Sequence, residues 1–524
     1  MLKNSLSTIG HLVLIAFVIS GSAFLVQAEE TTDSSAKVKA DYKQHCAACH
    51  GAERLGAMGP ALLPDNLKRL RQQKASVVIA EGRTATQMPA FKNVLDEKQR
   101  NALVDYIFTQ PKVIPVWQEK DILASQVVTH KLNELPDKPV FEADLMNLFL
   151  VVEIGDHHVT VLNGDTFEPI HRFKSRFALH GGPKYSPDGR YVYFASRDGW
   201  ITKYDIYNLK VVAEVRAGIN TRNLAISSDG KAVIVANYLP YNLVMFDAEN
   251  LDMLKVYPVA NDAGKTSRVS AVYNAPPRNT FIAALKDLKE VWEIPYPVNG
   301  KPADVRKIVV DDYLDDFFFD PDYTLLIGAS RDAHDGKEVK GGQVINLDLG
   351  KVVNSIPLPG MPHLGSGITW DYPMKNDKGL LEMRQVLASP NLKEGKVSVI
   401  DMTTWKVIKD IKTEGPGFFM RSHENSPYAW VDVFFGPNKD KVHVIDKSTL
   451  EIVKTLRPSP GKTAAHVEFN KDGSKVILSI WDMDGEIIIY DANTLEEEKR
   501  LPMVKPSGKY NVWNKTQYER GTSH

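Results

Sequence analysis

Two cysteines and a histidine stand together in Cys46-Ala-Ala-Cys49-His50, and the 524 residues contain no other cysteine. This spacing is typical of covalent attachment of a c-type haem, in which both thiols form thioether bonds and the histidine binds the iron. A thioredoxin-like redox pair and half of a zinc site share parts of the pattern. The first needs a βαβ context and the second needs further Cys or His at ligand spacing, and neither is convincing here. We therefore predict one covalent haem.

A small α-helical domain, residues 36–112, is predicted to surround this motif. Apolar residues recur at helical spacing in residues 41–50, 65–73 and 97–109. Asp96 stands directly before the last of these stretches, where the N-cap of a helix is expected.

The loop Gly82-Arg83-Thr84-Ala85-Thr86-Gln87-Met88-Pro89 offers a methionine as the second axial ligand. Ligation by Met and His raises the potential of a haem and suits electron transfer. The run resembles the distal loop of class I cytochromes c, so we predict that Met88 binds the iron. Met58 and His45 are the alternative ligands, and Met88 would then be ordinary packing.

Residues 1–28 have the pattern of a secretory signal peptide. Lys3 precedes an apolar stretch from Leu12 to Val26, and the small residue Ala28 ends the segment. We expect cleavage after this segment and a periplasmic location, which suits haem attachment outside the cytoplasm. An uncleaved membrane anchor is the alternative.

Charge is nearly balanced, with 64 Lys and Arg against 65 Asp and Glu. This balance gives no support to a nucleic-acid partner. The absence of further cysteines leaves no disulfide framework, so an apolar core must stabilise the chain.

From about residue 140 onward, short β-type stretches recur with Asp-Gly turns, as in Asp188-Gly189, Asp229-Gly230 and Asp472-Gly473. Eight strand ends repeat at roughly 42 to 54 residues, a period typical of a β-propeller with several strands in each unit. The eight ends are Asn163, Asp205, Asp247, Ile294, Asp348, Asp401, Asp446 and Asp491. We predict a mainly β chain with an eight-bladed propeller over residues 140–524, joined to the helical domain by a linker at 113–139. A pair of β-sandwiches is the alternative.

The combination of these two domains resembles the cytochrome cd1 nitrite reductase family, over nearly the whole mature chain. Its proximal ligand of haem d1 lies in a phrase similar to Ala178-Leu179-His180-Gly181-Gly182, so the resemblance implies that His180 binds the d1 iron. Arg197 and Arg222 lie in phrases whose arginines bind the carboxylates of the macrocycle, which suits the two parallel donors of a guanidinium. A loop histidine and a surface ion pair of Arg197 with Asp198 are the structural alternatives.

The chain departs from the reductases at one of two distal histidines. His363 is retained in Met361-Pro362-His363-Leu364-Gly365, but Asp315 stands where the other histidine is expected. The phrases Gly59–Pro64, Gly415–Phe419 and Pro506–Asn514 are similar to the dihydro-haem d1 dehydrogenases, a branch of the same family that acts in haem d1 biosynthesis.

This resemblance implies an oxidoreductase that removes two hydrogens from a propionate side chain of dihydro-haem d1 and leaves an acrylate. The covalent c haem would accept the electrons one at a time. A histidine with a pKa near neutrality is the expected base. His363, His423 and His466 are the candidates, and each has a structural role as its alternative.

Two other functions remain open: a cd1-type nitrite reductase, and a carrier that binds haem d1 without changing it. A quinoprotein dehydrogenase is more remote, because no tryptophan-docking repeat is found. The expected partners are the tetrapyrrole, a soluble periplasmic electron acceptor, and nitrite reductase or other haem d1 maturation proteins.

Overall fold

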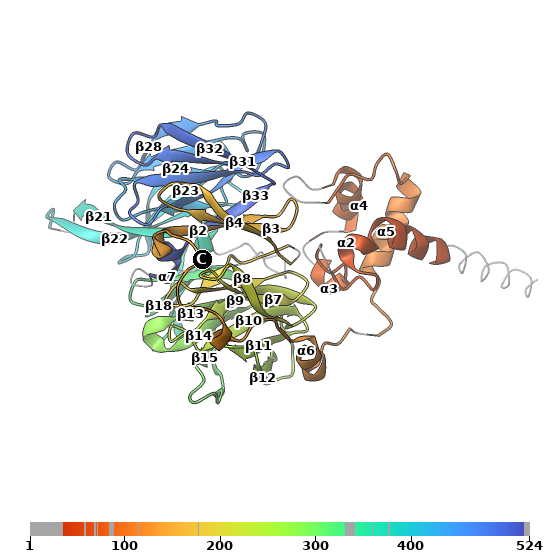
Figure 1. The fold of residues 1–524 in the computed structure, drawn as a ribbon. Helices are drawn as coiled ribbons and strands as arrows, with labels where there is room; N and C mark the ends of the chain where they lie inside the picture. Colours follow the sequence, from red (N-terminus) through yellow and green to blue (C-terminus); the bar gives the residue numbers. More distant parts are fainter. Residues whose placement is uncertain are drawn as a thin grey trace, which may run out of the picture. The chain divides into compact units, whose positions relative to one another are not determined.

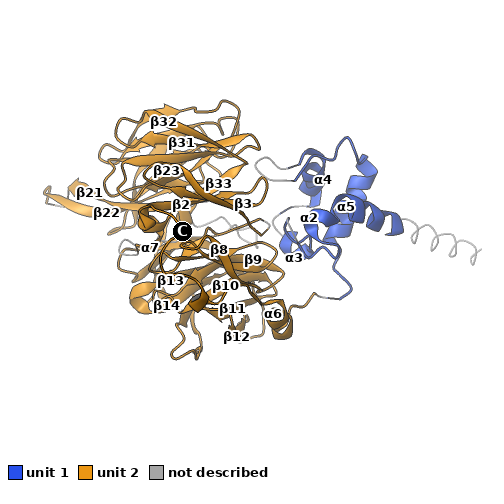
Figure 2. Cartoon of the chain, in the orientation of Figure 1, with its two compact units in different colours: residues 1–84, 88–113 blue, residues 85–87, 114–524 orange. Residues whose placement is uncertain are grey.

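The computed structural model describes residues 35–56, 59–67, 70, 72–82, 88–113, 115–176, 178–330, 341–358, 360–375 and 378–517. The chain divides into two compact units, residues 1–84 with 88–113 and residues 85–87 with 114–524 (Figure 2). The predicted signal peptide lies outside the described residues. Among the helices that are described, none is both long and apolar enough to cross a membrane.

The first unit is a small helical bundle. Its helices are α2 (Ala47–His50), α3 (Pro64–Leu67), α4 (Gln72–Glu81) and α5 (Glu97–Phe108), and residues 35–45 are also helical. Buried side chains of Tyr42, Ala75, Ile79 and Leu103 belong to its core.

Helix α5 begins where the sequence indicates. The Asp96 carboxylate accepts a hydrogen bond from the Gln99 N–H at 2.7 Å, and the Gln99 side chain accepts one from the Asp96 N–H. This reciprocal arrangement is a capping box. The helix expected over 65–73 is different, because α3 ends at Leu67 and α4 begins at Gln72.

The second unit contains, within its described residues, eight sheets that form the blades of a propeller (Figure 1). Blade 1 consists of β33 (Pro506–Asn511), β2 (Leu148–Glu153), β3 (His158–Asn163) and β4 (Pro169–Lys174). Blade 2 consists of β5 (Lys184–Tyr185), β6 (Tyr191–Ala195), β7 (Trp200–Asp205), β8 (Lys210–Arg216) and the added strand β1 (Val127–Val128). Blade 3 consists of β9 (Asn220–Ile226), β10 (Ala232–Leu239), β11 (Asn242–Asp247) and β12 (Met253–Pro258). Blade 4 consists of β13 (Val269–Ala275), β14 (Thr280–Leu285), β15 (Glu290–Pro295) and β16 (Arg306–Val309).

The other four blades follow the same order. Blade 5 consists of β17 (Leu314–Phe319), β18 (Leu325–Ser330), β19 (Gly342–Asn346) and β20 (Lys351–Ile356). Blade 6 consists of β21 (Ile368–Lys375), β22 (Leu381–Pro390), β23 (Lys396–Asp401) and β24 (Lys406–Lys412). Blade 7 consists of β25 (Met420–Ser422), β26 (Tyr428–Asp432), β27 (Val442–Asp446) and β28 (Glu451–Leu456). Blade 8 consists of β29 (Ala464–Phe469), β30 (Lys475–Ile480), β31 (Gly485–Asp491) and β32 (Glu497–Met503).

Short helical turns complete the described elements: α6 (Glu119–Ser125), α7 (Val512–Thr516), η1 (Leu132–Glu134), η2 (Leu145–Asn147), η3 (Pro276–Arg278) and η4 (Leu364–Ser366). The predicted eight-bladed propeller with a cytochrome-type helical region before it is confirmed, and the pair of β-sandwiches is wrong. The stretch expected as a linker contains α6 and β1, and β1 pairs with β8.

The ring closes through the C-terminal strand. Strand β33 pairs antiparallel with β2, with Phe149 opposite Asn511 and Val151 opposite Lys509. The first strands of neighbouring blades contact one another, as β9 contacts β13 and β29 contacts β33. These strands therefore line the axis of the propeller, and the residues at their ends converge at its mouth.

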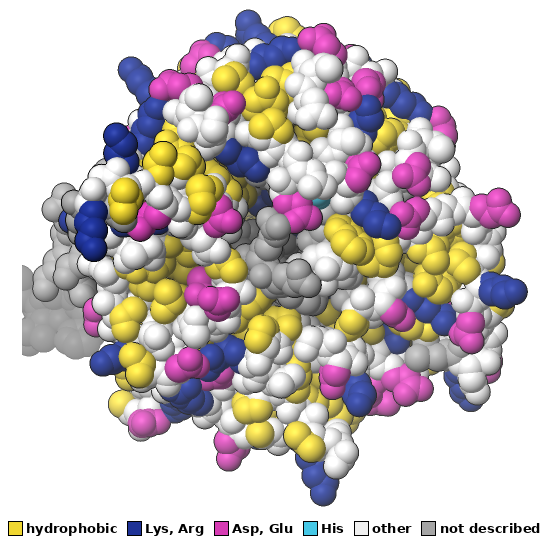
Figure 3. Space-filling model, turned by 90° about the vertical axis from the view of Figure 1, so that its left-hand side faces the viewer, with side chains coloured by type: hydrophobic (Ala, Val, Ile, Leu, Met, Phe, Trp, Pro, Cys, Tyr) yellow, Lys and Arg dark blue, Asp and Glu magenta, His cyan; other side chains and the backbone are white. Residues whose placement is uncertain are grey.

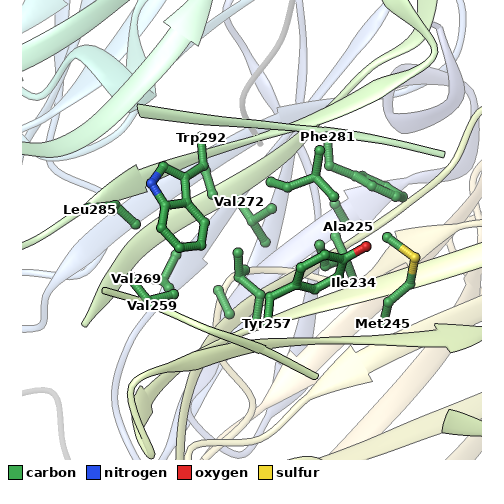
Figure 4. Close-up of a cluster of buried hydrophobic side chains, with 14 of the residues drawn as sticks. Ala225, Ile234, Met245, Tyr257, Val259, Val269, Val272, Phe281, Leu285 and Trp292 are labelled. Atoms are coloured by element: carbon green, nitrogen blue, oxygen red, sulfur yellow. The ribbon is translucent and has the colours of Figure 1, made fainter. Parts of the chain in front are cut away.

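Apolar side chains fill the space between neighbouring blades. Between blades 3 and 4, Ile234 and Met245 pack with Phe281 and Trp292 in one buried cluster (Figure 4). Inner strands such as β14 bury every residue, because both faces of a blade are covered by its neighbours. Charged side chains of both signs are mixed over the face shown in Figure 3.

Removing the Phe281 ring should destabilise the propeller. Phe281 is fully buried and packs against Tyr296 with ring centroids 4.9 Å apart. We expect Phe281→Ala to lower the free energy of unfolding by about 3–5 kcal/mol, as is usual for a buried aromatic truncation. Urea unfolding followed by circular dichroism measures this. Val298→Ala is the control, since Val298 is 72% exposed and the change should stay within about 0.5 kcal/mol; equal losses in both variants would contradict the packing argument.

Candidate functional site

The cysteine–histidine motif is folded around the start of α2. Cys46 is the N-cap residue of this helix and His50 is its last residue. The Nδ1 atom of His50 lies 2.8 Å from the Pro60 carbonyl oxygen, which accepts the Nδ1 proton and leaves Nε2 with a lone pair. A Cβ at Gly59 would lie 2.7 Å from His50 Cε1, so glycine is needed beside the imidazole.

The electrostatics of this segment suit thioether chemistry better than a redox pair. Burial, and then the neighbouring Cys49, raise the pKa of the Cys46 thiol to about 11. Redox-active C-x-x-C motifs instead have a thiol whose pKa is lowered. Burial also lowers the pKa of His50, so its imidazole is neutral and able to bind a metal. The two thiols, the oriented imidazole and the close approach of Gly59 to that imidazole fit a covalent haem.

Met88 packs against the buried cluster of the helical unit that includes Tyr42 and Leu95. The ring of His45 lies 6.2 Å from that of Phe91, and Met58 lies outside the described residues. Met88 as the second axial ligand therefore stays a prediction.

His180, four residues before the start of β5, is held by Arg222 from two sides. Its Nδ1 lies 2.6 Å from the Arg222 carbonyl oxygen, and its Nε2 lies 2.8 Å from Nη1 of the Arg222 guanidinium. Because Nδ1 donates to the carbonyl, Nε2 carries the lone pair and accepts from the guanidinium. Arg222 Nε donates to the Ser270 carbonyl at 2.9 Å, which anchors the arginine on β13.

Arg197 ties the same segments together through its main chain. Its N–H donates to the Ala178 carbonyl at 3.2 Å, and its carbonyl accepts from the Thr221 N–H at 3.3 Å. The three segments that the sequence indicates for the macrocycle, around His180, Arg197 and Arg222, are thus neighbours at one mouth of the ring.

Asp315 forms an ion pair with Lys286. Its Oδ1 lies 3.3 Å from the Lys286 ammonium, which also donates to the Tyr238 hydroxyl at 2.7 Å. The next residue, Asp316, accepts from the Tyr273 hydroxyl at 2.9 Å, and its Oδ2 lies 3.8 Å from His363 Nε2. Asp316 is therefore the carboxylate beside His363, a neighbour that the sequence does not reveal.

His363 has the same orientation device as His50 and His180. Its Nδ1 lies 2.6 Å from the Phe418 carbonyl oxygen, and its ring lies 4.3 Å from the Phe418 ring. Burial lowers the pKa of His363, although Asp316 opposes this shift. The imidazole is therefore neutral, and its Nε2, on the side of Asp316, carries the lone pair. This nitrogen can accept a proton or bind a metal.

The other two candidate histidines lie at different places in blades 7 and 8. His466 is 97% buried on β29, with its ring 4.8 Å from Phe419 and 5.2 Å from Tyr510. His423 follows the last residue of β25, at the opposite end of that strand from Phe418 and Phe419. There its Nδ1 accepts from the Asn425 N–H at 3.1 Å, in a turn that packs on Gly473.

Tyr510 is a candidate that sequence reasoning does not single out. A Cβ at Gly182, two residues after His180, would lie 2.8 Å from the Tyr510 ring, and the ring also contacts His466. The phenol therefore stands between the His180 segment and blade 8. Its stretch, Pro506–Asn514, is one of the phrases that the sequence marks, but nothing there distinguishes Tyr510 from its neighbours.

Comparison with known proteins decides the family. Residues 143–515 match the model of the cytochrome D1 heme domain. The chain belongs to this family. Residues 34–107 match the model of cytochrome c oxidase, cbb3-type, subunit III, which supports a c-type cytochrome domain before the d1 domain.

Full-length relatives share both parts. A dihydro-heme d1 dehydrogenase of Pseudomonas aeruginosa is 60% identical over 483 residues, covering 92% of this chain and 95% of the relative. A nitrite reductase of Stutzerimonas stutzeri is 26% identical and covers 97% of each chain. A solved structure of dihydro-heme d1 dehydrogenase NirN in complex with DHE matches with a TM-score of 0.80 and 59% identity, over 91% of this chain and 99% of that one. These findings confirm the predicted resemblance and support a role in haem d1 biosynthesis.

Covalent haem attachment should depend on the thiols of Cys46 and Cys49. We expect the double variant Cys46→Ala/Cys49→Ala to lose all haem that survives acid denaturation, because no thioether can form. Mass spectrometry of the denatured chain measures the attached haem. His45→Ala should retain it, and loss of haem from that variant too would point to misfolding instead.

Tetrapyrrole binding should depend on His180. Because Nδ1 is held by the Arg222 carbonyl, Nε2 is the ring nitrogen that would bind an iron, in exchange for the hydrogen bond that it accepts from the Arg222 guanidinium. We therefore expect His180→Ala to weaken binding of dihydro-haem d1 by roughly 100-fold. Spectroscopic titration of the purified protein gives the dissociation constant. The control is His171→Ala on the outermost strand of blade 1, which should bind normally; equal affinities of both variants would show that His180 is not the ligand.

Proposed function

We propose that this chain is a dehydrogenase that converts a propionate side chain of dihydro-haem d1 into an acrylate. The observation that carries this proposal is the 60% identity, over almost the full length of both chains, to a dihydro-heme d1 dehydrogenase. The residues at the propeller mouth supply the chemistry that such a reaction requires. The reaction turns –CH2–CH2– into –CH=CH–, with two protons and two electrons leaving.

The substrate must first be held in one orientation. To bind the iron of the substrate, the Nε2 lone pair of His180 would exchange the hydrogen bond that it accepts from the Arg222 guanidinium for the metal. Arg222 is partly buried, and although burial opposes its charge, Tyr238 and the aspartates Asp315 and Asp316 raise its pKa. A permanently charged guanidinium next to His180 suits a carboxylate of the macrocycle, since its donors are fixed in a fork. Arg197 is placed to support the same subsite.

The protons require acceptors beside the side chain that reacts. His363 and His466 are both next to the Phe418–Phe419 pair, which forms an apolar wall between them. Burial raises the pKa of Tyr510 to about 12. The phenol therefore stays protonated at neutral pH and can donate a hydrogen bond. We assign proton acceptance to His363 and His466 rather than to His423, because His423 lies at the other end of β25.

The electrons require an acceptor in the same chain. Bound at Cys46, Cys49, His50 and Met88, a c-type haem supplies one-electron acceptance. We propose that residues 36–112 hold this group, that 113–139 connect it to the propeller at 140–524, and that a soluble acceptor in the periplasm receives the electrons.

Nitrite reduction is the second candidate function, since a nitrite reductase is a full-length relative. The ion pair of Asp315 with Lys286 argues against it, because a carboxylate held by an ammonium is a poor proton donor.

The proposed function predicts a change of mass in the substrate. With the holoprotein, dihydro-haem d1 and a one-electron oxidant, the extracted tetrapyrrole should lose two hydrogens, as measured by mass spectrometry. The variant lacking Cys46 and Cys49 should bind the substrate and leave its mass unchanged. Binding without any change in the unaltered protein would show a carrier, and steady production of nitric oxide from nitrite would show a reductase.

The geometry also ranks the histidines. We expect His363→Gln to lower the conversion rate by about 10²- to 10⁴-fold, the usual contribution of a positioned acid or base. His423→Gln should change it by less than about twofold, since its ring packs in a turn beyond β25. Stopped-flow spectroscopy with bound substrate gives both rates, and similar losses in the two variants would refute the ranking.

A further inference from the structure

The main chain of His466 has a conformation that few non-glycine residues adopt. Its φ angle is +56°, in the left-handed region. An L-residue persists there only when its surroundings hold it, and such residues cluster at functional sites. The left-handed turn interrupts the pairing of β29 with β30, which shifts register between Ala465 and Val467. The strand thereby directs the His466 ring toward Tyr510 and Phe419.

Two fully buried charged side chains hold this residue from both sides. Asp432, the last residue of β26, accepts the His466 N–H at Oδ2 over 3.3 Å. Lys509, on the closing strand β33, donates from Nζ to the His466 carbonyl and to the Ser479 hydroxyl, the latter at 2.9 Å. Neither charged side chain is exposed to solvent. We call Asp432 and Lys509 the clamp.

Asp432 is also linked to His363, through the main chain of Phe418 and Phe419. Its Oδ1 accepts the N–H groups of Phe418 at 2.7 Å and of Phe419 at 3.1 Å. The carbonyl of Phe418 in turn accepts the Nδ1 proton of His363. One carboxylate is therefore bonded to the segment that orients His363 and to the main chain of His466.

Burial disfavours the charged form of both members of the clamp. Burial raises the pKa of Asp432 to about 7, although three backbone N–H donors and the charge of Lys509 act to lower it. Burial also lowers the pKa of Lys509 well below its usual value. Apolar residues of similar volume commonly stabilise a fold as well as a buried charged group does. Stability alone therefore gives little reason for an aspartate and a lysine at these positions.

We propose that Asp432 and Lys509 are positioning residues that set His363 and His466 relative to each other at the mouth of the propeller. This inference rests on the proposed function, in which both histidines face the substrate side chain. The clamp acts through the Phe418–Phe419 segment and the left-handed turn at His466, and its members do not themselves meet the substrate. Loss of the clamp should leave substrate affinity intact and slow the conversion.

The first test compares two matched aspartate variants. Asp432→Asn keeps the size of the side chain but cannot accept at both positions. We expect the dissociation constant of dihydro-haem d1 to stay within about twofold. The conversion rate should fall about 10- to 100-fold, because a small misplacement of reacting groups slows a reaction by such factors.

The control is Asp205→Asn, because Asp205 is also fully buried, accepts the N–H groups of Tyr207 and Asn208, and pairs with Arg190. It lies on β7, away from the candidate histidines, and its rate should stay within twofold of the unaltered protein. An unaltered rate in Asp432→Asn, or the same loss in both variants, would overturn the inference.

A second readout needs no substrate turnover. In protein labelled with ¹⁵N-histidine, the Nδ1–H of His363 should give a low-field nuclear magnetic resonance signal because it donates to the Phe418 carbonyl. This signal should shift or broaden in Asp432→Asn and persist in Asp205→Asn; an unchanged signal in Asp432→Asn would contradict the link. If the unaltered protein fails to convert dihydro-haem d1, the proposed function fails, while this signal still tests the clamp.

The single variant removes one of the two carboxylates, Asp432 and Glu468, whose charges favour the charged form of the buried Lys509, and this loss can unfold the chain. The double variant Asp432→Asn/Lys509→Gln removes both charges and is measured in the same way if the single variant is unfolded. A folded double variant with normal rate and normal His363 signal would overturn the inference. A reduced rate with normal affinity and a shifted signal would support it.

Discussion

Each blade of the propeller buries both of its faces against its neighbours, and this constraint decides where polar chemistry can lie. Strands such as β2, β14 and β29 have no exposed residue. A polar side chain inside these layers must find a partner, as Lys203 does by donating to the carbonyls of Ala248 and Glu249. The ends of the axial strands escape this restriction, since eight of them converge on one opening. Candidate residues that are far apart in sequence therefore meet there.

One solution to the problem of orienting an imidazole occurs in both units. His50, His180 and His363 each place Nδ1 at 2.6 to 2.8 Å from a backbone carbonyl oxygen. A carbonyl cannot donate, so it fixes the tautomer and leaves the lone pair on Nε2, which in His180 accepts from the Arg222 guanidinium. The helical bundle and the propeller share no architecture, yet the same elementary bond prepares a histidine in each. It is insensitive to pH in a way that a carboxylate partner is not.

Much of the fold follows from local patterns, whereas the clamp does not. The period of strand ends predicts eight blades because each blade repeats the same turns, and the Cys46–His50 motif is a local signal. The helix expected over 65–73 fails, since α4 at 72–81 is selected by Ala75 and Ile79 packing in the core. Asp432, Lys509 and Tyr510 carry no local signal: their roles arise only when blades 7, 8 and 1 meet. The left-handed turn at His466 is equally hard to predict, because even histidine, which is enriched in this region, adopts it only rarely.

The pairing of β33 with β2 has a consequence for how the chain reaches its native state. The bond from the Val504 N–H to the Glu153 carboxylate spans 351 residues, and the strands on either side of it can meet only after the blades between them exist. Contacts at such separation slow folding, since the loop entropy is lost before the contact forms. Until then β2 presents an unpaired edge, which is a template for association with other chains. Pairing of β33 therefore also covers the exposed edge of β2 and removes this site of aggregation.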